Sequence, residues 1–116
     1  MARVEERRNE SRVPLEMYLT TYVQDRPLRG FTANVSESGL YINTRPSSRL
    51  PQRTWLGLEL ELPGVPETIW AAGELCYDEL DDYFLGNGIR FVAMARRHLG
   101  LLSAFLTGLR QGKLPA

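Results

Sequence analysis

The chain has 116 residues, of which 43% are hydrophobic and 24% are charged, a composition typical of one globular domain with a single modest core. Fourteen basic and fourteen acidic residues cancel, and this balance excludes a general field that would attract nucleic acid polymers or anionic membranes. Any anion site must therefore be local.

The single cysteine, Cys76, excludes an internal disulfide and a cysteine-based zinc cluster. It lies in a strand-like run, where we expect a buried, inert thiol. No apolar run approaches the roughly 20 residues that a membrane span requires, and the charged N-terminus lacks the apolar core of a signal peptide. We therefore expect a cytoplasmic protein that does not insert into membranes.

Residues 1–12 carry seven charges and almost no apolar side chain, which predicts a flexible N-terminal arm. Residues 13–116 are expected to form a single domain. Its first strand is predicted from Val13, because apolar side chains then recur at every second position. The residues on that face are Val13, Leu15, Met17, Leu19, Thr21 and Val23.

The second predicted strand also alternates. We expect Phe31, Ala33 and Val35 to point into the core. Thr32, Asn34 and Ser36 would then point outward. Residues 36–39 follow as a hairpin loop.

Four further strands are predicted at residues 40–44, 55–62, 68–77 and 85–94, followed by a helix that starts at about residue 95. In the 55–62 strand every second residue is a leucine, and in the helix the leucines recur at helical spacing. Six short strands and one terminal helix predict an all-β fold, a closed six-stranded antiparallel barrel with a C-terminal α-helix. Leu101 and Phe105 widen the apolar surface of the helix, either for deeper burial or for contact with another chain, which could be a second copy or an effector.

Two short motifs stand out. Arg8 and Arg12 are four residues apart and so lie on one face of either an extended chain or a helix. A guanidinium fork suits a phosphate or the O6 and N7 edge of guanine. The spacing alone is common, since Arg3 and Arg7 share it.

The second motif is Asn34-Val35-Ser36-Glu37-Ser38-Gly39. An amide and a hydroxyl two residues apart could meet a base edge from the outer face of the strand. Gly39 could take a positive φ and leave room for a flat ligand. In the alternative reading, Asn34 and Ser36 merely cap a hairpin.

Together and in this order, the motifs resemble the PilZ domain family, whose pattern is Arg-x-x-x-Arg followed by Asp/Asn-x-Ser-x-x-Gly. The later Gly88-Ile89-Arg90-Phe91 and the terminal helix are also similar. The resemblance implies a receptor for cyclic di-GMP in which Arg8 and Arg12 clasp the ligand as the arm closes. The remaining residues that it implicates are Asn34, Ser36 and Gly39, with Ser38 and Arg90 at the periphery.

In this family, an arginine directly before the first motif arginine tends to favour a stacked ligand dimer. Arg7 occupies that position. The resemblance therefore implies two cyclic di-GMP molecules per chain. It also implies a bacterial protein that signals to an unidentified partner, typically in the control of motility or biofilm formation.

Three other classes of function fit the sequence less well. A PilZ-like adaptor that acts only through protein contacts would usually lack the intact motifs. A barrel that binds single-stranded nucleic acid would need a basic groove with stacking aromatics. An enzyme would need a nucleophile and base or a metal cluster, and His98 is the only histidine in the sequence. We therefore expect a binding protein with no cofactor besides its ligand.

Overall fold

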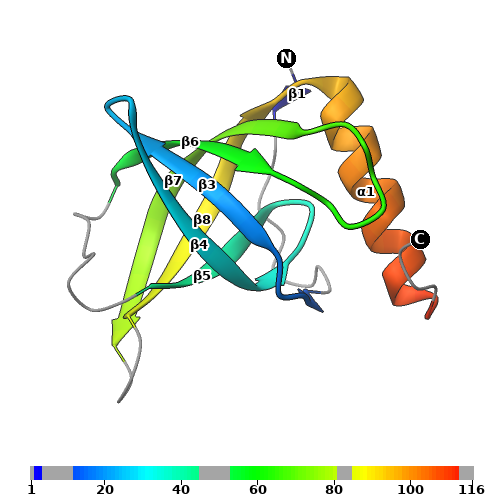
Figure 1. Ribbon diagram of the computed structural model, residues 1–116, viewed down its shortest axis with the longest axis horizontal. Helices are drawn as coiled ribbons and strands as arrows, with labels where there is room; N and C mark the ends of the chain where they lie inside the picture. Colours follow the sequence, from blue (N-terminus) through cyan, green and yellow to red (C-terminus); the bar gives the residue numbers. More distant parts are fainter. Residues whose placement is uncertain (1, 4–11, 45–52, 81–84, 113–116) are drawn as a thin grey trace.

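The fold is a closed antiparallel β-barrel with one helix, shown in Figure 1 as a computed structural model that describes residues 2–3, 12–44, 53–80 and 85–112. Six longer strands form the barrel, in the spatial order β8-β5-β4-β3-β6-β7, and β7 pairs with β8 to close it. Their bounds are β3 (Tyr18–Val23), β4 (Arg26–Val35), β5 (Gly39–Thr44), β6 (Trp55–Leu60), β7 (Ile69–Leu80) and β8 (Leu85–Met94). The predicted six-stranded barrel is confirmed.

Two short strands lie beside the barrel. β1 (Ala2–Arg3) pairs with β8, and β2 (Val13–Pro14) pairs with β4. Both residues of β1 belong to the predicted arm. Arg7 and Arg8 of the same arm lie outside the described residues. Within the described parts of the chain, no helix is long and apolar enough to cross a membrane.

The barrel interior is filled by the alternating apolar residues of its strands. Leu58 and Leu60 of β6 are fully buried, and Met17 and Leu19 are almost fully buried at the start of the barrel wall. The alternation predicted from Val13 onward and that predicted for residues 55–62 are therefore confirmed. Close packing of such side chains is the main stabilising contribution in a domain of this size.

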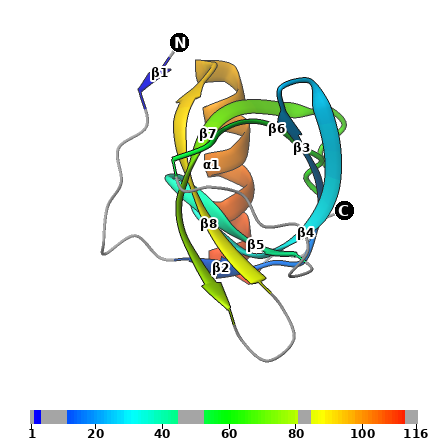
Figure 2. The same cartoon turned by 90° about the vertical axis from the view of Figure 1, so that its left-hand side faces the viewer.

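The helix α1 (Arg96–Arg110) lies across one end of the barrel, as Figure 2 shows in a view into the barrel with α1 behind it. Leu102 and Leu106 are fully buried in the core. Leu101 and Phe105 are partly buried and pack against the same core. Of the two roles expected for this wider apolar surface, the structure supports burial.

The predicted orientation of the β4 side chains is wrong just before the second motif. Phe31 is 41% exposed and Thr32 is 2% exposed, the reverse of the expectation. The register of β4 against β5 shifts between Thr32 and Asn34, which marks a β-bulge. Since a bulge adds one residue to one strand, it reverses the alternation and lets both Thr32 and Val35 face inward.

The expected burial of Cys76 is also wrong, because this thiol is exposed. The register of β7 against β8 shifts between Leu75 and Tyr77, so Cys76 lies at a second irregularity. Leu75 keeps its inward position and is fully buried. The alternation that buries Leu75 places the neighbouring Cys76 on the outer face, and this overrides the general tendency of a free cysteine to be buried.

Candidate ligand-binding site

The short strand β2 brings the two sequence motifs together. Val13 pairs with Val35 and Pro14 with Asn34, so the chain enters the barrel directly beside the end of β4. Arg12 precedes this strand, and its Nη1 donates a hydrogen bond of 3.0 Å to Oδ1 of Asn34. Arg12 of the first motif and Asn34 of the second, 22 residues apart in the sequence, are therefore in direct contact.

Thr32 fixes the segment that follows Arg12. Its hydroxyl donates to the carbonyl oxygen of Leu15 and accepts a hydrogen bond of 3.1 Å from the backbone N–H of Met17. The backbone N–H of Thr32 donates in turn to the carbonyl of Met17, at 3.0 Å. A threonine expected on the outer face thus satisfies backbone groups that would otherwise be buried without partners.

Ser36 forms the turn between β4 and β5. Its hydroxyl accepts a hydrogen bond of 3.2 Å from the backbone N–H of Ser38 and lies 3.1 Å from the Ser38 hydroxyl. The backbone N–H of Ser36 donates to the carbonyl of Gly39 at 2.8 Å. Ser36 is only 1% exposed, so its predicted outward projection is wrong, and of the two roles left open the capping of the hairpin is the one observed.

Gly39 is required by close strand packing. Its φ is not positive, whereas Gly64 and Gly112 have φ values of 77° and 78°. A Cβ placed on Gly39 would overlap the carbonyl oxygen of Ile89 and lie 3.2 Å from Cα of Arg90. The residue therefore lets β5 approach β8, a reason that differs from the predicted positive φ.

A surface pocket opens beside this turn. It is lined by Arg12, Ser38, Gly39, Cys76, Gly88, Ile89 and Arg90. The glycines contribute backbone only, so flat groups can approach the strands closely. Two of the lining residues are arginines, and the charge of Arg12 is not matched by a carboxylate among the residues that line the pocket.

Arg90 is held in place by an ion pair across β7 and β8. Its Nη2 lies 3.0 Å from Oε1 of Glu74, with 41% of the arginine side chain exposed. The Nε of Arg90 is buried and has no hydrogen-bond partner among the described residues.

The geometry suits a planar, anionic ligand with acceptor groups. Arg12 uses one of its five N–H donors on Asn34, which leaves the others for a phosphate or a base edge. Of the predicted residues, the structure brings Arg12, Ser38, Gly39 and Arg90 to the pocket, with Asn34 beside it and Ser36 beneath the turn. Cys76, Gly88 and Ile89 were missed, because only the pairing of β5, β7 and β8 reveals that they line it.

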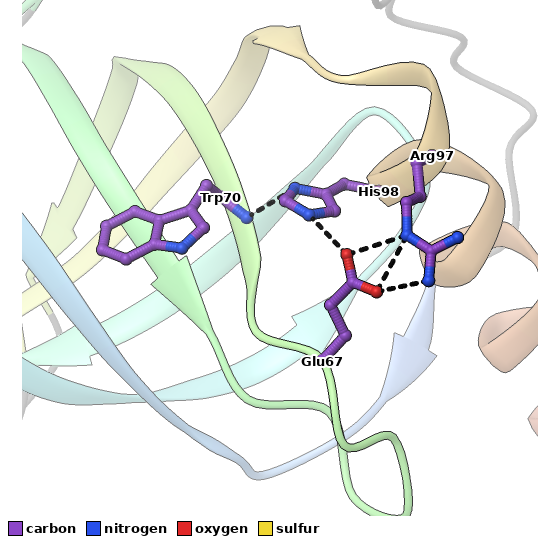
Figure 3. Close-up of polar contacts among 4 residues, drawn as sticks. All are labelled: Glu67, Trp70, Arg97 and His98. Atoms are coloured by element: carbon purple, nitrogen blue, oxygen red, sulfur yellow. Dashed lines mark hydrogen bonds and ion pairs between the residues drawn. The ribbon is translucent and has the colours of Figure 1, made fainter.

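His98 takes part in a different set of contacts, drawn in Figure 3. Its Nδ1 accepts a hydrogen bond of 3.1 Å from the backbone N–H of Trp70, and its Nε2 lies 3.1 Å from Oε2 of Glu67. Arg97 donates to the same carboxylate, lowering the pKa of Glu67, while the carboxylate raises the pKa of Arg97. These contacts join the start of α1 to the segment before β7 and to β7 itself.

The chain is thus a small barrel with a helix across one end and a pocket with two arginines beside the turn of the second motif. A family model of the PilZ domain matches residues 6–108, and the chain therefore belongs to the PilZ domain family. No curated protein sequence matches the chain.

Solved structures of low sequence identity share this fold. The inhibitor of motility MotI (DgrA) of Bacillus subtilis matches with a TM-score of 0.83 and 14% identity, over 94% of this chain and 54% of that one. YcgR of Escherichia coli, solved with c-di-GMP, matches with a TM-score of 0.76 and 15% identity, over 92% of this chain and 47% of that one. The chain thus spans about half the length of either protein.

The PilZ domain of YcgR by itself, also solved with c-di-GMP, matches with a TM-score of 0.69 and 15% identity, over 92% of this chain and 95% of that one.

Proposed function

We propose that this protein is a receptor for cyclic di-GMP. The observation that carries the proposal is the contact between Arg12 and Asn34 at the rim of a pocket that contains a second arginine, Arg90. Family membership and the c-di-GMP complex of the YcgR PilZ domain support the same ligand. The protein would bind and release this ligand without chemical change.

The N-terminal arm, residues 1–12, would order over the bound ligand, and residues 13–116 would form the receiving domain. Arg8 would join Arg12 in clasping the guanine edges and phosphates, and Asn34 would contact a guanine from the barrel. Ser36 would act by shaping the turn, since it is buried. The ordering of the arm lowers the net affinity but couples the ligand to a change of shape.

Arg7 would set the stoichiometry at two ligand molecules per chain. A guanidinium next to Arg8 would neutralise the added phosphates of a stacked ligand pair. Calorimetry should therefore saturate at two molecules of cyclic di-GMP in the wild type and at one in Arg7→Ala. Saturation of the wild type at one molecule would refute this part of the proposal.

Isothermal titration with cyclic di-GMP tests the proposal, with GTP and cyclic di-AMP as competing ligands. We expect Arg12→Ala to weaken binding by about 1–3 kcal/mol, as for other bidentate arginine contacts with guanine. Arg29→Ala is the matched control: Arg29 is exposed on β4 and lies over the ring of Tyr18, outside the pocket-lining set. Equal affinity of wild type and Arg12→Ala would contradict the proposed role of Arg12.

The receptor would act in the cytoplasm by passing its state to a partner protein, in motility or biofilm control. The second candidate is an adaptor that works through protein contacts without ligand. It would be favoured if no selective binding of cyclic di-GMP were found. The intact pair of Arg12 and Asn34 argues for the receptor, because an adaptor has no need of this contact.

A further inference from the structure

Helix α1 is joined to the barrel by an arginine–glutamate pair at each end. Near its start, Arg97 donates to Glu67 through Nε and Nη2, at 2.9 Å and 2.6 Å. In its last turn, Arg110 donates to Glu37 through Nη1 and Nη2, both at 2.7 Å. Each pair is bidentate, the arrangement that gives arginine–carboxylate contacts their directional strength.

The two pairs differ in where the glutamate lies. Glu67 belongs to the segment before β7 (Figure 3), whereas Glu37 lies inside the turn of the second motif, between Ser36 and Ser38. The neighbouring Ser38 lines the pocket, and its carbonyl accepts a hydrogen bond of 2.8 Å from the N–H of Phe91 on β8. A displacement of Glu37 would therefore move a residue that lines the ligand site.

The Arg110–Glu37 pair is also the better shielded of the two. Its side chains are 26% and 23% exposed, compared with 72% for Arg97 and 34% for Glu67. Partly buried charges are screened less by solvent and salt, so their geometry is held more firmly. The cation lies in the last turn of α1, where the helix dipole favours it.

We propose that Arg110 and Glu37 are positioning residues for the ligand-binding turn. Neither side chain lines the pocket, but their ion pair fixes the turn so that Ser38 and Gly39 face the ligand. The proposal rests on the proposed function as a cyclic di-GMP receptor. Because binding couplings are reciprocal, a bound ligand would in turn hold the last turn of α1 more firmly against the barrel.

The test measures cyclic di-GMP affinity by calorimetry for Glu37→Gln, Arg110→Gln and the charge swap Glu37→Arg/Arg110→Glu. We expect each single variant to bind about fivefold more weakly, the low end of typical coupling between sites. The swap should bind more tightly than either Glu37→Arg or Arg110→Glu alone. Affinity equal to wild type in both Gln variants would overturn the proposal.

Arg97→Gln is the matched control, since it removes the corresponding pair at the other end of the same helix. We expect it to lower the melting temperature while leaving affinity within about twofold of wild type. An affinity loss equal to that of Arg110→Gln would show that the helix acts only through general stability. That outcome would also overturn the proposal.

Amide hydrogen exchange separates this proposal from the receptor function. The Phe91 N–H, which donates to Ser38, should exchange faster in Glu37→Gln than in Arg97→Gln, without any ligand. If the wild type failed to bind cyclic di-GMP, the receptor proposal would fall, and faster Phe91 exchange would still support positioning of the turn. Unchanged exchange would refute the positioning itself.

Discussion

Replacing Thr32 by valine should destabilise the protein and loosen the approach to the ligand site. Valine keeps the shape of threonine but removes the hydroxyl that joins the N–H of Met17 to the carbonyl of Leu15. The N–H of Met17 is closed to water, since Thr32 is 2% exposed and Met17 is 4% exposed, whereas the carbonyl of Leu15 is only partly buried. Leaving a buried backbone group unpaired costs about 1–3 kcal/mol and a partly buried one costs less, so we expect a total loss of about 2–3 kcal/mol.

Thermal unfolding measures this loss. An entropy of unfolding of about 2.1 cal/mol/K per residue gives a shift of about 4 °C per kcal/mol for a domain of this length, or about 8–12 °C for Thr32→Val. Thr32→Ser is the control, because it keeps the hydroxyl and loses one buried methyl group, at a cost of about 1 kcal/mol. The reasoning would be refuted if valine were tolerated better than serine.

Thr32→Val should also weaken ligand binding more than its stability loss explains. The Leu15–Met17 segment that the hydroxyl holds continues from β2, which places Arg12 beside Asn34. Titration at a temperature where the variant remains folded would detect this effect. Affinity equal to that of Thr32→Ser would show that β2 holds its position without the hydroxyl.

Three other predictions follow from packing and charge. Gly39→Ala should cost on the order of 1–3 kcal/mol in urea unfolding, because its Cβ would overlap the carbonyl of Ile89. Acidification should weaken the attachment of α1, because the hydrogen bond from Arg97 lowers the pKa of Glu67 below its ordinary value of 4.5. The ionised Glu67 stabilises the fold above pH 4.5, and this contribution is lost as pH falls through the lowered pKa. Tyr22 should titrate above its ordinary pKa of 10.0, since its hydroxyl donates a hydrogen bond of 2.8 Å to Oε1 of Glu59. The contribution of this bond to stability is lost as pH rises through the raised pKa.

Each of these predictions has a control in the same chain. A Cβ added at Gly100 would meet no atom within 4 Å, so Gly100→Ala should stabilise the helix by about 1 kcal/mol. A similar loss of stability in Gly39→Ala and Gly100→Ala would contradict the packing argument. In Glu67→Gln, the melting temperature should fall less between pH 5 and pH 3 than it does in the wild type. Glu59→Gln should return the Tyr22 absorbance titration toward its ordinary pKa, and an unchanged curve would exclude Glu59 as the cause.

Much of the fold could be predicted from local patterns. Leu56, Leu58 and Leu60 recur at every second residue, and all three are buried as the alternation requires. Leu102 and Leu106 recur at helical spacing and are buried in the same way. These predictions succeed because one periodicity decides both the secondary structure and the face that is buried.

The candidate site was predictable in its composition and less so in its geometry. Arg12 and Asn34 were expected to act together, and they form a hydrogen bond. The roles of Thr32, Ser36 and Gly39 were misassigned, because the bulge in β4 and the close approach of β8 are properties of strand pairs. One inserted residue reverses an alternation that the sequence alone shows as unbroken.

The strands, the helix, the barrel architecture and the family motifs follow from the spacing of residues that are near one another in the chain. Which distant residues meet depends on the three-dimensional fold. Arg110 contacts Glu37 across 73 residues, and the pocket joins residues of β5, β7 and β8 to Arg12. Such contacts depend on the register and closure of the barrel, which arise from the packing of all strands together.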